Sequence, residues 1–217
     1  MNAPVFPDDG PVCGLYLVIT DPRAGYEACA EAAVRAGVRT VQLRMKHATR
    51  EERLLRARNL RTITRGTPTR FIVNDDPALA EEVQADGVHL GQTDMPLAEA
   101  RRRHPGLRFF GLSTHSAAQA EAADAAAPAY IGVGPVFATP TKEVPDAVLG
   151  CAEAGRIIRA VRVPAVAIGG IDEATLPQVL AAGAEHFAVV RAVCASPAPF
   201  EAIRRLQELY ASGAESH

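Results

Sequence analysis

The chain has 217 residues, of which 48% are hydrophobic and 5% aromatic, a length that suits one domain with a sizeable core. Its net charge of −2 supplies neither the basic surface of a nucleic-acid-binding protein nor an acidic tail. The four cysteines fit no CxxC spacing, no apolar run is long enough to span a bilayer, and the first residues lack the pattern of a signal peptide. We therefore expect a cytoplasmic protein with no membrane partner and no nucleic-acid partner.

Eight short apolar runs recur along the chain and predict β-strands. They cover residues 15–20, 40–44, 70–74, 87–91, 108–114, 130–136, 165–170 and 186–190. Ala-rich helical stretches separate them, and strands that alternate with helices pair in parallel. We predict a single (β/α)8 barrel (TIM barrel) over residues 13–217, preceded by a flexible arm over residues 1–12. A doubly wound open sheet is the alternative.

The starts of several helices carry recognisable capping signals. Thr49 and Glu52 form a capping box, and Gly66 is placed to end the helix that follows. Asp76 is expected to cap the next helix, with Pro77 at its first position. Three later starts are predicted in the same way, at the Ser116–Gln119 pair, at Asp172 and at Ser196 before Pro197.

The strand predicted at residues 40–44 has an unusual polar face. Alternation would send Gln42, Arg44 and Lys46 to the same side, which a strand facing an ordinary core avoids because burying unpaired charge is costly. The active sites of such barrels lie at the carboxyl ends of the strands, and both lysines of the chain, Lys46 and Lys142, fall there. Because Arg serves everywhere else, we interpret these lysines as positions where a compact point charge matters.

Two carboxylates follow neighbouring predicted strands. Asp75 and Asp94 can converge on a hard cation, and oxygen ligands without His or Cys favour Mg²⁺. The alternative is that these carboxylates cap helices, as Asp76 is expected to do. Asp94 precedes Met95 and Pro96, which suits a cap, whereas Asp75 lies one residue too early to be the better cap. Together with a divalent ion, the positive charges of Arg44, Lys46 and Lys142 match the several negative charges of a pyrophosphate. An internal ion-pair network with the two carboxylates is the other interpretation.

A second anion site is predicted at the last two strands. Gly169 and Gly170 form a tight turn, and the loops after strands seven and eight are the usual phosphate site of this barrel. The remaining candidates are weaker: His89 and His186 are interpreted as core histidines, His115 as a minor candidate for substrate contact and Cys194 as structural.

Six segments in register resemble the thiamine-phosphate synthase family from the first strand to the last. They are "VQLRMK", "VNDDPALAEEVQADGVHLGQTDMP", "GLSTHS", "YIGVGPVFATPTKE", "VAIGGI" and "VVRAV". The resemblance implies a transferase that joins 4-amino-2-methyl-5-hydroxymethylpyrimidine diphosphate to a thiazole phosphate, releasing pyrophosphate. It also implies Mg²⁺ as cofactor and small molecules as partners; a homo-oligomer is possible.

The family roles carry over to this chain position by position. The pyrimidine diphosphate would be bound by Gln42, Arg44, Lys46, Asn74, Ser113 and Lys142. Among these, Arg44, Lys46, Ser113 and Lys142 would act in catalysis, and Asp75 and Asp94 would bind the metal. The thiazole phosphate would be bound by Thr139, Thr141, Gly170, Val190 and Arg191. At position 191 the family usually has Ser, so this chain departs from the pattern there.

Two other functions compete with the synthase. A thiazole tautomerase of the same superfamily needs neither the carboxylates nor the cluster of cations. A non-catalytic phosphate-binding barrel would keep Gly169 and Gly170 but lose the metal ligands. Asp75, Asp94, Lys46 and Lys142 together favour the synthase over the tautomerase, and the presence of both aspartates argues against the non-catalytic barrel.

Overall fold

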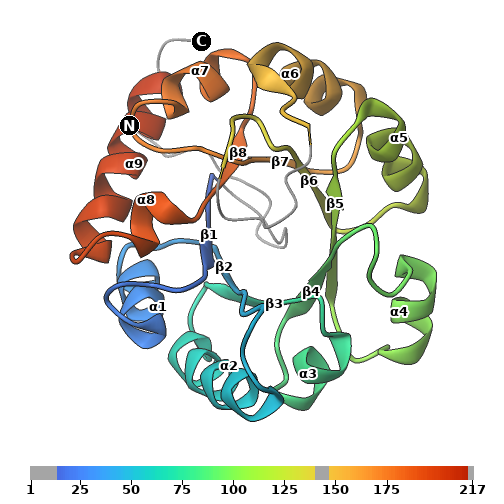
Figure 1. The fold of residues 1–217 in the computed structure, drawn as a ribbon, viewed down its shortest axis with the longest axis vertical. Helices are drawn as coiled ribbons and strands as arrows, with labels where there is room; N and C mark the ends of the chain where they lie inside the picture. The colour runs from blue at the N-terminus through green and yellow to red at the C-terminus, as the bar shows by residue number, and fades with distance from the viewer. Residues whose placement is uncertain (1–13, 140–146, 215–217) are drawn as a thin grey trace.

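Eight parallel strands close into one barrel in the computed structural model, which describes residues 14–139 and 147–214. Each strand pairs with its neighbour in the chain, and β1 closes the barrel against β8 (Figure 1). The predicted barrel is therefore confirmed, and the open sheet is wrong. The predicted arm over residues 1–12 lies outside the described residues.

The strands coincide with the predicted apolar runs, but most end one to three residues earlier. Their bounds are β1 Leu15–Ile19, β2 Thr40–Leu43, β3 Arg70–Asn74, β4 Gly87–Leu90, β5 Phe109–Thr114, β6 Tyr130–Val133, β7 Ala165–Ile168 and β8 His186–Val189. The last residues of several runs have left the sheet and form the loops at the carboxyl end of the barrel. The predicted site residues therefore lie on loops as well as on strand ends.

Helices surround the barrel on its outer face (Figure 1). Their bounds are α1 Tyr26–Arg35, α2 Arg50–Thr64, α3 Pro77–Glu82, α4 Leu97–Arg103, α5 Ala117–Ala126, α6 Gly150–Ala160, α7 Leu176–Ala181, α8 Arg191–Cys194 and α9 Pro199–Ala214. The described part of the chain thus has one helix more than the eight predicted. The additional element is α8, a single turn that follows β8.

Two predicted helix starts are confirmed in detail. Thr49 Oγ1 accepts from the Glu52 N–H at 3.2 Å, and the Thr49 N–H donates to Glu52 Oε2 at 2.8 Å, so the capping box of α2 is complete. Asp76 Oδ1 accepts from the Leu79 N–H at 2.9 Å and caps α3. These caps fix where the chain turns after β2 and β3, close to the expected site.

The cap of α5 differs from the prediction in one bond. Ser116 Oγ accepts from the Gln119 N–H at 3.2 Å, as expected. The Gln119 side chain, however, accepts from the His115 N–H at 2.7 Å, one residue before the predicted partner. The longer reach of Gln satisfies the donor that precedes the cap residue.

Two predicted starts are wrong by three residues or more. Asp172 Oδ1 accepts from the Thr175 N–H at 3.0 Å in a turn, and α7 begins only at Leu176. Ser196 likewise precedes a turn, and α9 begins at Pro199. Asp and Ser side chains bond to nearby backbone N–H groups in turns as well as in caps, so the same signal marks both structures.

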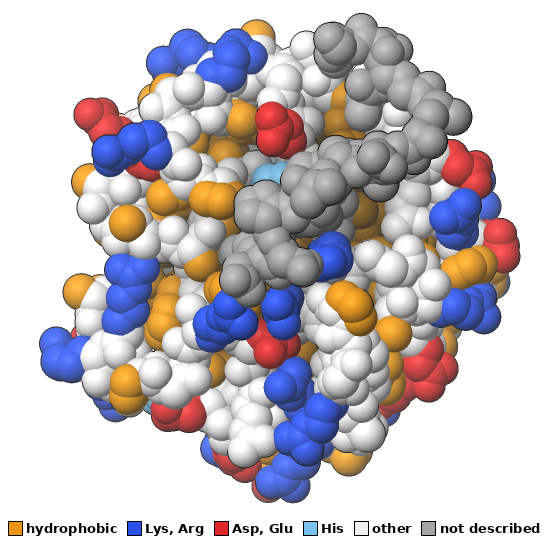
Figure 2. Space-filling view, turned by 180° about the vertical axis from the view of Figure 1, so that it is seen from behind, with side chains coloured by type: hydrophobic (Ala, Val, Ile, Leu, Met, Phe, Trp, Pro, Cys, Tyr) orange, Lys and Arg blue, Asp and Glu red, His pale blue; other side chains and the backbone are white. Residues whose placement is uncertain are grey.

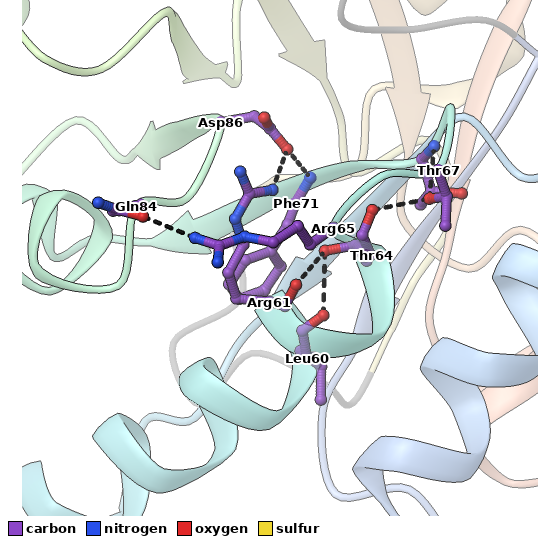
Figure 3. Close-up of polar contacts among 9 residues, drawn as sticks. Leu60, Arg61, Thr64, Arg65, Thr67, Phe71, Gln84 and Asp86 are labelled. Atoms are coloured by element: carbon purple, nitrogen blue, oxygen red, sulfur yellow. Dashed lines mark hydrogen bonds and ion pairs between the residues drawn. The ribbon is translucent and has the colours of Figure 1, made fainter.

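A polar cluster fastens α2 to the amino ends of β3 and β4 (Figure 3). Asp86 Oδ2 accepts from the Phe71 N–H at 2.8 Å and from Arg61 Nη1 at 3.1 Å. Nearby, Arg65 Nη2 donates to Gln84 Oε1 at 2.7 Å. These contacts lie at the end of the barrel opposite the site, and their role is to hold the scaffold together.

The core has two layers because successive strand residues point to opposite faces of the sheet. Residues such as Leu17, Val41 and Phe71 are fully buried between the strands and the helices. A smaller cluster, which includes Tyr16 and Tyr130, fills the barrel interior. The interior layer is unusual because it carries hydroxyl groups that need hydrogen-bond partners.

Candidate functional site

The predicted cation and carboxylate cluster forms at the carboxyl ends of β2, β3 and β4. Lys46 Nζ donates to Asp75 Oδ2, which joins the loop after β2 to the residue that follows β3. Asp94, on the loop after β4, accepts from the Gly91 N–H at 2.6 Å through Oδ2. Figure 2 shows basic and acidic side chains close together near the middle of the face turned away in Figure 1.

Asp75 has a backbone conformation that few residues other than Gly adopt. Its φ of +63° lies in the left-handed region, which costs roughly 1 kcal/mol or more for a residue with a Cβ. Its N–H donates to the His89 carbonyl at 2.8 Å, and the Asp76 N–H donates to the Asn74 carbonyl at 2.8 Å. This turn separates the two aspartates, so that Asp76 caps α3 while Asp75 pairs with Lys46.

The two carboxylates influence each other. Removal of water raises the pKa of Asp94, and the neighbouring Asp75 raises it further, while the Gly91 N–H and Lys46 act in the opposite direction. Two adjacent carboxylates that share one ammonium group form an acidic centre suited to a divalent cation. No group of three or more His, Cys, Asp or Glu side chains is arranged for a metal within residues 14–139 and 147–214. The described residues would therefore supply two ligands, and Mg²⁺ commonly takes others from water and phosphate.

Arg44 follows β2 near this cluster, and its charge is unpaired among the described residues. Its N–H donates to the Ile19 carbonyl at 2.9 Å, which fixes the backbone just past β2. The side chain is half-buried, and its guanidinium forms no ion pair with any described residue. A partly desolvated cation without a carboxylate partner is suited to binding an anion. Asn74, the last residue of β3, is also half-buried, and its amide has no partner among the described side chains.

Gln42 and Ser113 are joined inside the barrel by residues that the sequence prediction did not assign to the site. Gln42 is buried, and its Nε2 donates to Tyr16 Oη at 2.7 Å. Ser113 Oγ lies 2.9 Å from His89 Nε2. Tyr130 completes the connection between Tyr16 and His89. His89 was expected to be a core histidine, and it does lie within a hydrogen-bonded interior.

Burial determines the protonation of this interior group. It lowers the pKa of His89 to about 4, because loss of water outweighs the attraction of Asp94, and the nearby His115 lowers it further. Burial also raises the pKa values of Tyr16 and Tyr130 above the usual value for tyrosine. All three side chains are therefore neutral near pH 7.

The glycine turn after β7 packs closely against the loop that follows β6. Gly169 and Gly170 have φ values of +105° and +65°. A Cβ at position 170 would lie 2.7 Å from Phe137 Cβ, so only Gly fits there. The Gly170 N–H donates to no acceptor among the described residues, while its carbonyl accepts from Thr175 Oγ1 at 3.1 Å. A free N–H in this turn can bind an anion.

The end of β8 supplies the other half of the predicted phosphate site. Val190 precedes α8, and Arg191 is its first residue, so the Arg191 N–H has no acceptor within the helix. The Arg191 side chain is exposed and forms no ion pair with the described residues. Thr139 lies half-buried on the loop after β6. The predicted residues Thr141 and Lys142 lie outside the described part of the chain.

Three weaker candidates have structural contacts. His115 Nδ1 lies 2.7 Å from the Gly134 carbonyl and connects β5 to the loop after β6. His186 Nδ1 accepts from the Gly14 N–H at 3.2 Å, at the amino end of β1. Cys194 is buried, its thiol donates to the Val18 carbonyl at 3.5 Å, and contact with Cys29 together with burial raises its pKa. The structural role expected for Cys194 agrees with these contacts.

The fold and the site together define a parallel (β/α)8 barrel with a cluster of basic and acidic side chains at the carboxyl ends of its strands. The family model described as thiamine monophosphate synthase matches residues 15–193. The chain belongs to this family.

Individual relatives agree with the family match. A thiamine-phosphate synthase from Synechococcus sp. (strain WH7803) is 44% identical over 198 residues, which cover 88% of this chain and 56% of the relative. One from Archaeoglobus fulgidus is 41% identical over 193 residues, covering 88% of this chain and 90% of the relative. This chain thus spans about half the length of the Synechococcus relatives, with 56% and 51% covered in two of them.

Solved structures share the barrel fold. The thiamine phosphate pyrophosphorylase from Pyrococcus furiosus superposes with a TM-score of 0.84 at 31% identity, over 93% of this chain and 96% of that one. A 3-hexulose-6-phosphate synthase, with a TM-score of 0.62 at 18% identity, shares the barrel fold.

Proposed function

We propose that the chain is a thiamine-phosphate synthase, which joins the pyrimidine diphosphate to the thiazole phosphate and releases pyrophosphate. The observation that carries the proposal is the cluster of Lys46, Asp75 and Asp94 at the carboxyl ends of three adjacent strands. A barrel that binds only a monophosphate has no need for this cluster. The names of the relatives support the same reaction.

The diphosphate would bind at this cluster. Arg44 and Lys46 would neutralise negative charge as the diphosphate leaves, and Lys142 would add to them. The adjacent carboxylates of Asp75 and Asp94 fit Mg²⁺, because a divalent charge would offset the burial and the neighbouring carboxylate that raise the pKa of Asp94. When bound, the ion would supply further positive charge to the leaving group.

The chemistry requires charge neutralisation and exclusion of water more than proton transfer. The amino group of the pyrimidine donates electrons to the ring. The diphosphate can therefore leave the methylene carbon as an anion, and the pyrimidine that stays behind is a stabilised cation. The thiazole nitrogen then attacks this carbon. Gln42, Asn74 and Ser113 would orient the pyrimidine, and positioning of the two reactants would account for much of the rate. No general base is required.

The thiazole phosphate would bind at the other side of the barrel opening. The Gly170 N–H, which has no acceptor among the described residues, and the Arg191 N–H are suited to phosphate oxygens. Thr139, Thr141 and Val190 would complete this site. The Arg191 side chain, unpaired among the described residues, would contribute directly or through water.

Product formation tests the proposal. The purified chain is incubated with both substrates and Mg²⁺, and thiamine phosphate and pyrophosphate are quantified. Equal amounts of both products are expected. Isomerisation of a thiazole substrate without pyrophosphate would instead indicate the tautomerase, and binding of phosphate without turnover would indicate a non-catalytic barrel.

Location and assembly are part of the proposal and need their own measurements. None of the helices in the described part of the chain has both the length and the apolar character of a membrane span. We propose a cytoplasmic enzyme, which fractionation of cells would check. A homo-oligomer stays a prediction, and light scattering of the purified protein would test it.

A further inference from the structure

Five side chains from five strands form a continuous line of hydrogen bonds through the barrel interior. Gln42 Nε2 donates to Tyr16 Oη at 2.7 Å, and Tyr16 Oη lies 2.8 Å from Tyr130 Oη. Tyr130 Oη lies 3.1 Å from His89 Nδ1, and His89 Nε2 lies 2.9 Å from Ser113 Oγ. Both ends of the line are residues expected to bind the pyrimidine substrate. The three residues between them have no role in the proposed function.

The barrel makes room for this line at one glycine. Tyr130 is 0% exposed and Tyr16 2% exposed, so neither hydroxyl can use bulk water as a partner. A Cβ at position 111 would lie 2.6 Å from His89 Nδ1 and nearer still to the Tyr130 hydroxyl. Gly111 is therefore needed for His89 and Tyr130 to meet.

The line of bonds can be satisfied in only one direction. The Gln42 amide nitrogen can only donate, so Tyr16 accepts from it and must find an acceptor for its own hydrogen. Among the described residues that acceptor is Tyr130 Oη, and Tyr130 then donates to His89 Nδ1. The opposite direction would leave the buried Tyr16 hydroxyl hydrogen without an acceptor, which is costly.

This direction fixes the state of His89. Because Nδ1 accepts, the ring proton lies on Nε2 and the ring is neutral. Nε2 then donates to Ser113 Oγ, and the hydroxyl hydrogen of Ser113 finds no acceptor among the described residues.

We propose that Tyr16, Tyr130 and His89 are positioning residues, which hold His89 as the Nε2–H tautomer and thereby present the Ser113 hydroxyl as a hydrogen-bond donor to an acceptor atom of the pyrimidine substrate. The identity of that substrate rests on the proposed function. The direction of the hydrogen bonds rests only on the contacts within the barrel.

The tautomer can be measured without any assay of activity. Proton–nitrogen correlation spectra of the protein with isotope-labelled histidine distinguish the two neutral tautomers and the charged ring, and loss of one signal in His89→Gln assigns it among the six histidines. We expect His89 to be neutral with its proton on Nε2 at pH 7.5. A proton on Nδ1, or a charged ring, overturns the proposal even if the chain proves to have no synthase activity.

Removal of one hydroxyl tests the link to function. In Tyr130→Phe, His89 Nδ1 loses its donor, so we expect a mixture of tautomers. We also expect kcat/KM for the pyrimidine diphosphate to fall about tenfold, with KM for the thiazole phosphate unchanged. Tyr210→Phe removes a hydroxyl from a ring that packs on Phe187 and should change neither quantity.

Each result decides one part of the proposal. If Tyr130→Phe keeps the pure Nε2–H tautomer, the hydrogen-bond direction is not set by Tyr130. If the tautomer changes and kcat/KM does not, the line has no positioning role. If Tyr130→Phe fails to fold, Tyr16→Phe is measured in the same way. This variant removes the hydroxyl that accepts from Gln42 Nε2, and it must lower kcat/KM for the pyrimidine diphosphate.

Discussion

At the scale of single residues, we expect the identity of the cation at position 46 to matter as well as its charge. Lys46 contacts Asp75 as a compact ammonium group in a chain that otherwise uses Arg almost throughout. We expect Lys46→Arg to lower kcat/KM for the pyrimidine diphosphate by about tenfold or more, because the planar guanidinium group does not fit between the Asp75 carboxylate and the diphosphate. Arg65→Lys, at the opposite end of the barrel, is the matched control. Steady-state kinetics equal to those of the parent would show that this lysine is a compositional accident.

Arg191 stands where the family resemblance leads us to expect Ser. A charged hydrogen bond to phosphate contributes roughly 1.5–3 kcal/mol, about a tenfold to hundredfold effect on affinity. We expect Arg191→Ser to weaken binding of the thiazole phosphate by such a factor and to leave binding of the pyrimidine diphosphate nearly unchanged. Titration calorimetry of each ligand at fixed Mg²⁺ and salt measures both. Unchanged thiazole phosphate affinity would rule out the contact, and tighter binding would mean that Arg191 obstructs the site.

At the scale of elements, the cluster around Asp86 holds α2 against β3. Its carboxylate accepts from the Phe71 N–H and from Arg61 in a partly buried setting. Asp86→Asn keeps the shape but removes the charge, and we expect a loss of about 1–2 kcal/mol in the free energy of unfolding. Urea denaturation measures this loss. Glu173→Gln breaks the exposed pair with Arg205 and should cost less, so equal losses would argue against a special role for Asp86.

The elements themselves were largely predictable from local patterns. Apolar runs gave all eight strands, and the Thr49 and Asp76 caps were correct, because these signals act within a few residues. The single-turn helix α8 was missed because it is too short to show the repeat of apolar residues that identifies a helix in a sequence. The start of α7 was misplaced because an Asp in a turn and an Asp in a cap bond to the same kind of donor.

The site was predictable where it depends on strand order and not where it depends on packing. Asp75 and Lys46 were expected together because neighbouring parallel strands end at the same rim. Tyr16 and Tyr130, by contrast, are 114 residues apart and meet across the barrel interior. No local pattern in the sequence specifies that contact, so the tyrosines and the contacts of His89 emerged only from the three-dimensional structure.

At the scale of the whole molecule, stability should depend on pH through His186. Its Nδ1 accepts from the Gly14 N–H, and burial lowers its pKa, with Glu185 acting in the opposite direction. Below the ordinary pKa of about 6.5, the unfolded chain therefore binds more protons than the folded one, and stability falls as the pH falls. The free energy of unfolding, measured with urea, should fall less between pH 7.5 and pH 5.5 in His186→Gln than in the parent. Identical changes would contradict a buried neutral His186.

The central claim is that the acidic and basic cluster at the carboxyl ends of β2, β3 and β4 makes the barrel a thiamine-phosphate synthase. The most direct test compares thiamine phosphate formation by the parent and by Asp94→Asn, with both substrates and excess Mg²⁺. Glu153→Gln serves as the control, because it changes an exposed carboxylate that pairs with Arg156 on α6. We predict steady product formation by the parent and by the control, and a rate lower by roughly hundredfold or more in Asp94→Asn with an unchanged circular dichroism spectrum. A parent that forms no thiamine phosphate, or an Asp94→Asn variant as fast as the parent, would contradict the account.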